Sequence, residues 1–203
     1  MLYYGDIMNA RTSLGKRRNI IIFLVVLFLI GIILGFVIFY KQNDIMKSSI
    51  GLELDNFVNL VKNTKQNQIL YHLIIVSGLF LLNFTVVGWL FNLFYFFYEG
   101  CSIGFSLAMF LFKFKVGGLF FGIAFNLLVK FIFVAVLFYI TMVGVNVIKK
   151  MVGSVVLAKN EISYMFLKRH ALILGIVLGI VLIYDMFWYF LGNKILGLFV
   201  FLL

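Results

Sequence analysis

The sequence predicts an all-α integral membrane protein, a bundle of about five transmembrane helices with short loops. The first reason is the segment 66–98, which runs for 33 residues without an Asp, Glu, Lys or Arg. A bilayer core is about 30 Å thick and about 20 apolar helical residues cross it, so this segment exceeds one crossing. The second reason is composition, since 65% of the chain is hydrophobic and 12% is charged, against about 25% charged in soluble domains. A mean hydropathy of +1.16 agrees.

Apolar runs bounded by charged or polar residues place the individual spans. The chain reads as a single membrane domain over residues 1–203, because little sequence is left outside the apolar runs. The first run has the length of a membrane anchor rather than of a signal-peptide core, so we expect it to remain in the protein. The expected spans are 19–40, 69–86, 90–112, 118–148 and 171–192.

Residues 69–112 admit two interpretations. In the first, a tight turn near Gly88 and Trp89 separates two spans. In the second, one long tilted helix continues to Tyr98, and a re-entrant half-helix starts at Gly100. The next boundary is clearer, because the segment Lys113–Gly118 contains two lysines and two glycines and predicts a turn.

Three segments are expected outside the bilayer. Residues 1–18 form a basic tail, 41–68 an external loop, and 149–170 a basic connector. Positive residues favour the cytoplasmic side, so the basic residues before the first span predict a cytoplasmic N-terminus. Within 41–68, apolar residues recur at helical spacing and predict an amphipathic helix on the membrane surface or at the end of the bundle, or a docking surface for a partner. Its apolar residues are Ile50, Leu54, Phe57, Val58 and Val61.

Three charged residues fall inside predicted spans: Glu99, Lys130 and Asp185. A charge in hydrocarbon is costly, so each should face the bundle interior and have a partner. If the chain reverses near residues 114–115, Glu99 and Lys130 lie equally far from the turn on adjacent antiparallel helices. We therefore expect these two to form an ion pair, which Asp185 can join. The pair either fixes helix packing or contributes to an ion path, a proton path or a contact that transmits a signal to a partner.

Glycine pairs spaced four apart occur in four spans. This spacing puts two small residues on one helix face and lets two backbones approach closely. We expect internal helix packing at these positions, with homo-oligomer formation as an alternative. The pairs are Gly31 and Gly35, Gly100 and Gly104, Gly118 and Gly122, and Gly175 and Gly179.

No sequence pattern of a catalytic or cofactor site is present. The chain has no His-Glu-x-x-His helix, nucleophile elbow or phosphate-binding loop, and its one cysteine, Cys101, has no partner for a metal or disulfide pair. The two histidines, His72 and His170, lie at span ends and are expected at the interface. The sequence predicts a protein that is not an enzyme and has no cofactor. The net charge of +10 fits membrane lipids rather than nucleic acid, because no basic domain lies outside the spans.

The most distinctive segment is 87–105, where Gly88 opens an aromatic-rich run that ends in Glu99, Gly100 and Gly104. It resembles the stage II sporulation protein M family of bacterial membrane proteins. Residues 27–35 look like the first span of that family, and 115–122, leading to Asn126, look like the start of its fourth.

The resemblance implies a non-catalytic scaffold in the bacterial cell membrane. Family members anchor and localise peptidoglycan-degrading partners that thin the septal wall and drive engulfment during sporulation. The alternative is the membrane subunit of an ATP-driven transporter, in which the connector 149–170 supplies a coupling helix. The apolar face of that helix would consist of Val152, Val155, Val156, Ile162 and Phe166.

Overall fold

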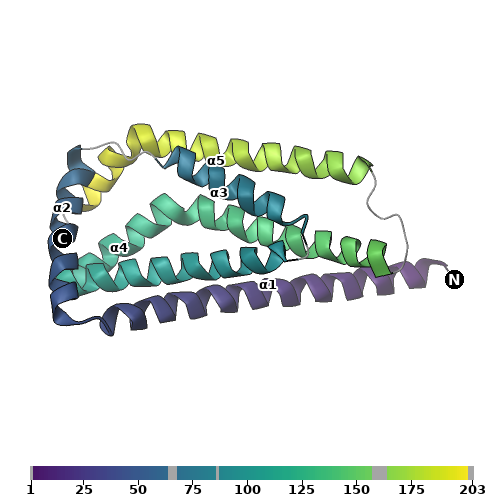
Figure 1. The fold of residues 1–203 in the computed structure, drawn as a ribbon, viewed down its shortest axis with the longest axis horizontal. Coiled ribbons are helices and arrows are strands. Elements are labelled where there is room, and N and C mark those ends of the chain that lie inside the picture. Colours follow the sequence, from purple (N-terminus) through teal and green to yellow (C-terminus); the bar gives the residue numbers. More distant parts are fainter. Residues whose placement is uncertain (1, 64–67, 86, 157–163, 201–203) are drawn as a thin grey trace.

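The fold is known from a computed structural model, which describes residues 2–63, 68–85, 87–156 and 164–200. These residues form five helices and no strand (Figure 1). Three helices contain segments long and apolar enough to cross a membrane, namely 18–40, 88–148 and 168–199. The prediction of an all-helical chain with several such segments is confirmed. The helices are α1 (Leu2–Tyr40), α2 (Asp44–Asn63), α3 (Ile69–Leu82), α4 (Gly88–Val156) and α5 (Tyr164–Phe199).

Helix α4 consists of two arms that fold back on each other. Non-helical backbone at Phe114 and Lys115 separates the arm 88–113 from the arm 116–156, and Figure 1 shows the two arms side by side. This reversal lies in the predicted turn. Lys115 has a φ of 57°, in the region that favours glycine. The strained residue is therefore a lysine, although two glycines follow it closely.

Helix α3 is shorter than the predicted span 69–86. It has 14 residues, which extend about 21 Å and fall short of the roughly 20 residues that cross a bilayer. The chain turns at residues 83–85 and enters α4 at Gly88, where an added Cβ would lie 1.6 Å from the Leu82 carbonyl oxygen. Residues 69–112 are thus two helices, and the alternative of one long helix to Tyr98 is wrong.

Helices α1 and α4 approach each other through glycines. A Cβ added to Gly35 would lie 2.1 Å from the Cys101 carbonyl oxygen, and one added to Gly104 would lie 1.9 Å from that of Ile32. Gly31 and Gly100 also meet, with the Cα of Gly31 3.4 Å from a Cβ built on Gly100. Two of the predicted glycine pairs therefore face each other and form the α1–α4 contact.

The other two glycine pairs behave differently. Gly118 supports the hairpin, because a Cβ there would lie 2.1 Å from the Phe110 carbonyl oxygen, whereas Gly122 meets only side chains. Among the described residues, no atom outside their own stretch of α5 lies within 4 Å of a Cβ added to Gly175 or Gly179, so the expectation that these glycines pack against another helix is wrong. The inward face of α5 carries Val177, Val181 and Asp185 at a spacing of four, which turns these glycines outward.

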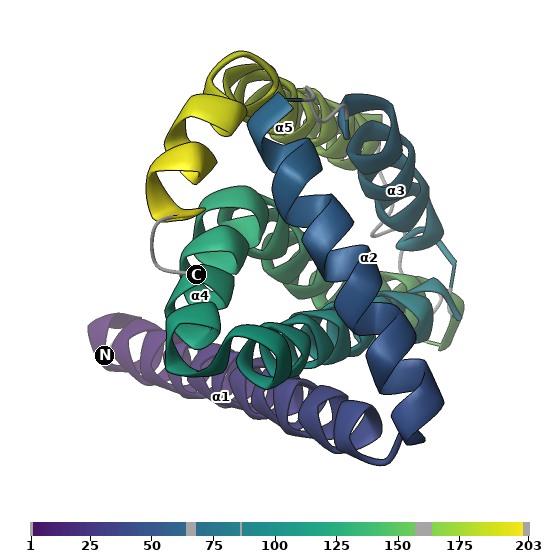
Figure 2. The same cartoon turned by 90° about the vertical axis from the view of Figure 1, so that its left-hand side faces the viewer.

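Helix α2 lies across one end of the bundle (Figure 2). Leu54 is buried there against Phe110 and Phe121 of α4, with Ile50 and Phe57 packed beside it. The predicted apolar stripe thus explains why this helix stays on the bundle. The side chain of Val61 lies outside the described residues.

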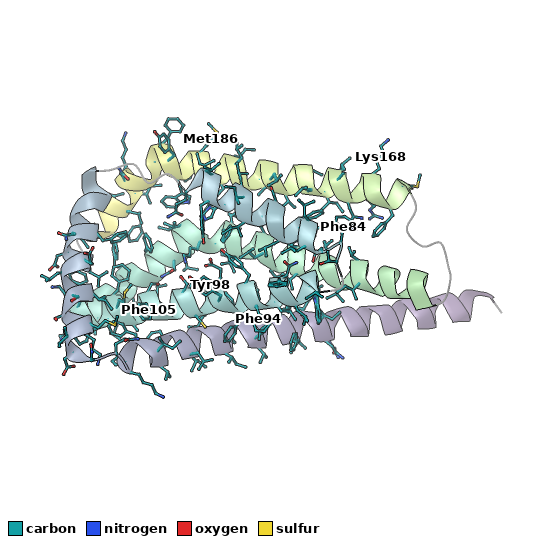
Figure 3. The ribbon with its side chains drawn as sticks, viewed as in Figure 1. Phe84, Phe94, Tyr98, Phe105, Lys168 and Met186 are labelled. Carbon is teal, nitrogen blue, oxygen red and sulfur yellow. The ribbon has the colours of Figure 1, made fainter. Side chains whose placement is uncertain are left out.

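The outer surface of the bundle is apolar (Figure 3). Phe94 of α4 is 71% exposed and Ile183 of α5 is 69% exposed. Apolar patches of a few hundred Å² already mark interaction surfaces on soluble proteins, whereas lipid accommodates a whole apolar exterior. The surface therefore fits a membrane environment.

The basic segments continue the long helices. Residues 2–18 belong to α1. The first part of the connector 149–170 belongs to the C-terminal end of α4, and its last part belongs to the N-terminal end of α5. The side chains of residues 1–17 and 149–164, and the whole of residues 157–163, lie outside the described part of the chain. Of the proposed coupling-helix face, only the side chain of Phe166 is therefore described.

We predict that Gly104→Val destabilises the protein, because the added side chain has no room against α1. Overpacking of this kind lowers the free energy of unfolding by about 1–3 kcal/mol. In a chain of this size, each kcal/mol lowers Tm by about 2–4 °C. Thermal unfolding of the purified protein in detergent measures the effect. Gly179→Val is the matched control, and equal falls for both variants would contradict the glycine contact.

We also predict opposite effects of two substitutions at the reversal. Lys115→Gly relieves backbone strain of about 1–3 kcal/mol and should leave Tm unchanged or higher. Lys115→Val puts a β-branched residue at positive φ and should lower Tm. The same unfolding experiment checks both, and a Val variant as stable as the Gly variant would show that the hairpin does not require this conformation.

Candidate functional site

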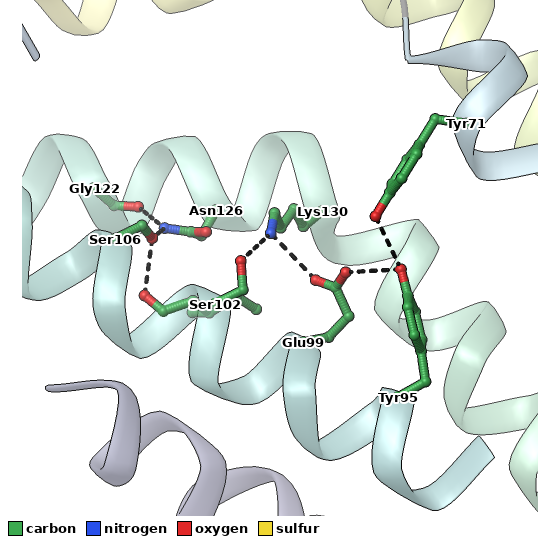
Figure 4. Close-up of polar contacts among 9 residues, drawn as sticks. Tyr71, Tyr95, Glu99, Ser102, Ser106, Gly122, Asn126 and Lys130 are labelled. Atoms are coloured by element: carbon green, nitrogen blue, oxygen red, sulfur yellow. Dashed lines mark hydrogen bonds and ion pairs between the residues drawn. The ribbon is translucent and has the colours of Figure 1, made fainter. Parts of the chain in front are cut away.

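The candidate site is a line of polar contacts between the two arms of α4 (Figure 4). Lys130 Nζ lies 3.2 Å from Glu99 Oε2, and the Glu99 side chain is only 5% exposed. The reversal at Lys115 produces this contact, because the two residues lie almost equally far from it along antiparallel arms. The structure thus brings Glu99 and Lys130 together in the register expected from the sequence.

Hydroxyl groups extend this ion pair at both ends. Lys130 Nζ also donates to Ser102 Oγ at 2.9 Å, and Tyr95 donates to the other Glu99 oxygen at 3.2 Å. The hydroxyl of Tyr71 on α3 lies 3.3 Å from that of Tyr95. Both charges therefore have further partners, which a buried ion pair needs to offset the loss of hydration.

A second contact crosses the arms closer to the reversal. Asn126 Nδ2 donates to Ser106 Oγ at 2.9 Å and to the Gly122 carbonyl at 2.8 Å. Asn126 Oδ1 is buried and has no hydrogen-bond partner among the described residues. The arms of α4 are thus joined by polar contacts on successive helical turns.

Asp185 does not join the Glu99–Lys130 pair. Its two carboxylate oxygens lie 2.9 Å and 3.0 Å from His72 Nδ1 of α3. His72 and Asp185 are 4% and 6% exposed, and the imidazole stacks on Phe133 of α4 at 4.1 Å between ring centroids. The third charge therefore belongs to a separate site between α3 and α5.

Both histidines are buried inside the bundle, and their position at the membrane interface stays a prediction. His72 is buried in the pair with Asp185, and His170 is 8% exposed, with Nδ1 2.8 Å from the Phe166 carbonyl oxygen. The sequence held one signal for the first of these. Asp185 lies inside an apolar run and needs a partner, and His72 is one of few polar residues in the equally apolar α3.

The turn between α3 and α4 has its own buried polar cluster. Asn83 is 1% exposed, donates to the Ile140 carbonyl at 3.0 Å, and accepts a 2.6 Å hydrogen bond from Asn92. A Cβ added to Gly144 would lie 2.2 Å from Asn83 Oδ1. Asn83 ends α3 early because its side chain binds the second arm of α4.

The chemistry available in these clusters is hydrogen bonding and charge pairing. Among the described residues, no group of three or more His, Cys, Asp or Glu side chains is placed to hold a metal ion. Cys101 is a free thiol on the side of α4 that packs against α1. The arrangement can join helices and hold charge inside an apolar bundle.

Comparisons with known proteins do not assign a family, because no protein-family model, no curated protein and no solved structure matches this chain.

We predict that the Glu99–Lys130 pair shows strong coupling in a double-mutant cycle. Glu99→Gln or Lys130→Met alone leaves one buried charge without its partner and should cost about 3–5 kcal/mol. The double variant Glu99→Gln with Lys130→Met should be more stable than either single variant. Thermal unfolding in detergent gives the four values of the cycle, and simple additivity would show that the pair is not coupled.

Proposed function

We propose that this chain is a non-catalytic scaffold of the bacterial cell membrane that holds partner proteins at its α2 end. The observation that carries this proposal is the position of α2 across one end of the bundle. A scaffold needs a rigid surface outside the lipid, and α2 is the described helix that lies across the others rather than beside them.

Contacts on the inner side of α2 fix its orientation. Leu54 is buried against α4, and Asp55 accepts a 2.7 Å contact from Lys113 Nζ near the α4 reversal. A partly exposed ion pair contributes little stability by itself, so its main effect is to define which face of α2 points outward. The helix is held by packing and oriented by charge.

The outward face of α2 carries large apolar side chains. Ile45 is 78% exposed and Leu52 is 68% exposed, and Met46 is also exposed. Beside them a groove of about 520 Å³ is lined by Lys47, Phe112 and neighbouring residues of α2 and α4. Exposed apolar residues beside polar ones are typical of protein–protein contact surfaces.

Basic residues support an external position for this end. Arg18, Lys168 and Arg169 are exposed and lie at the starts of the apolar segments of α1 and α5, opposite α2 (Figure 1). Positive residues beside membrane spans favour the cytoplasm. The N-terminus is then cytoplasmic and α2 faces the cell wall.

Peptidoglycan-degrading proteins are the partners that the family resemblance implies. The resemblance rests on residues 27–35, 87–105 and 115–126, which form the α1–α4 contact and the α4 hairpin. In this proposal the chain localises such enzymes for septal wall thinning and engulfment, and the enzymes perform the cleavage. The ATP-driven transporter remains the alternative, and it would work through the connector 149–170.

Affinity capture from native membranes tests the proposal. The tagged full-length chain is lightly crosslinked, solubilised in mild detergent and captured, and its partners are identified by mass spectrometry. We expect secreted or membrane-anchored wall hydrolases, and we expect Ile45→Asp with Leu52→Asp to reduce their recovery about tenfold, since losing about 1.4 kcal/mol of contact energy has that effect.

The matched control is Glu53→Gln, which changes an exposed residue of the same helix without altering its apolar surface. Its recovery of partners should equal that of the parent chain. Recovery of a cytoplasmic ATPase in place of wall hydrolases would reject the scaffold proposal and support the transporter.

A further inference from the structure

A small polar cavity lies beside the buried pair of His72 and Asp185. Its volume is about 20 Å³, and Gln68, Asp185 and Asn193 supply polar groups to its lining. A cavity needs roughly 10–15 Å³ to hold one water molecule, together with two to four polar partners. The volume meets the first condition, and three polar residues line the space. The remaining lining residues are Val129, Trp188, Gly192 and Leu196.

The lining residue Trp188 carries an indole N–H group, which is a hydrogen-bond donor. The indole Nε1 of Trp188 is buried and has no hydrogen-bond partner among the described residues. Buried N–H groups are rarely left unsatisfied, because desolvation without a partner costs about 1–3 kcal/mol. A water molecule in this cavity would lie beside the Asp185 carboxylate, which accepts hydrogen bonds, and beside the ring of Trp188.

The geometry of the pair requires a proton between its two residues. His72 Nδ1 is within hydrogen-bond distance of both Asp185 oxygens, and a nitrogen lone pair facing a carboxylate would be repulsive. Either the imidazole carries the proton at Nδ1, or the carboxyl group carries it and donates to Nδ1. Loss of that proton removes the hydrogen bond that joins α3 to α5.

We propose that His72 and Asp185 form a proton-binding site that exchanges protons with water through this cavity. The site lies near the α2 end of the bundle, because two residues of the cavity lining, Val129 and Leu196, pack against Phe57 of α2. It goes beyond the scaffold proposal and does not depend on any partner protein. Proton binding changes the charge at one contact between α3 and α5.

The other titratable groups near His72 are tyrosines or a lysine that is already paired, so Asp185 is the carboxylate of this site. Among the described residues, Tyr71 of α3 packs beside His72, and Tyr184 of α5 donates to the Leu128 carbonyl. Lys130 of α4 is adjacent in sequence to the lining residue Val129, but its ammonium binds Glu99 and Ser102. Among the described residues, two carboxylates are thus buried, one paired with a lysine and one with a histidine beside the cavity.

Dicyclohexylcarbodiimide, an apolar reagent that adds to protonated carboxyl groups, distinguishes these two carboxylates. The full chain carrying His72→Gln is reconstituted in liposomes, treated with the reagent, digested and analysed by mass spectrometry. Without the imidazole, a proton bound between these two positions can reside only on Asp185. We expect several-fold more adduct on Asp185 than on Glu99, which is paired with the Lys130 ammonium, and an increase as the bath pH is lowered.

Two substitutions at Asn193 test the route through the cavity. Asn193→Leu removes an amide and fills the space, so it should reduce labelling of Asp185 several-fold in the same background, whereas Asn193→Gln should not. Labelling of Glu99 in the same molecules is the reference for correct folding. Equal labelling of the two carboxylates, or labelling of Asp185 unaffected by Asn193→Leu, would overturn the proposal.

Discussion

The backbone reversal at Lys115 is the constraint on which the rest of the structure depends. It converts one very long apolar helix into two antiparallel arms and fixes their relative register. That register places Glu99 opposite Lys130 and Ser106 opposite Asn126. It also leaves one face of the first arm free for α1, which packs there against Gly100 and Gly104. A shift of one residue at the reversal would rotate every one of these side chains away from its partner.

Polar contacts and close backbone packing have complementary effects in this bundle. In lipid, apolar side chains gain little by leaving their surroundings, so helix association depends on dispersion contacts and hydrogen bonds. The α1–α4 contact uses small residues, and the contacts within α4 and between α3 and α5 use buried polar pairs. Close packing at glycines is compatible with several rotations of a helix about its own axis. The His72–Asp185 hydrogen bond is compatible with only one. The polar pairs therefore specify the arrangement that the apolar packing stabilises.

The sequence predicted contacts between neighbouring segments better than contacts between distant ones. The Glu99–Lys130 pair was predictable because a single turn separates its residues, so helix geometry alone fixes their relative position. The His72–Asp185 pair links residues 113 positions apart, and no local pattern reveals that α3 and α5 are adjacent. The length of α3 was misjudged for a similar reason, since it ends where Asn83 reaches the Ile140 carbonyl of a distant arm. The outward position of Gly175 and Gly179 follows from the same unpredicted contact, because binding His72 decides which face of α5 points inward.

Among the described residues, the two buried carboxylates are equally hidden but differ in what surrounds them. Glu99 accepts hydrogen bonds from the Lys130 ammonium and the Tyr95 hydroxyl, and Lys130 also donates to Ser102, so the network has little need of water. Asp185 has one imidazole as its partner and lines a small cavity. The first arrangement is suited to holding helices in a fixed register, because its charges compensate each other. The second depends on a single shared proton, because the hydrogen bond between His72 and Asp185 needs a hydrogen on one of the two groups. Two residues that line the cavity beside it, Val129 and Leu196, pack against Phe57 of α2, so the contact that joins α3 to α5 lies at the same end of the bundle as the helix proposed for docking.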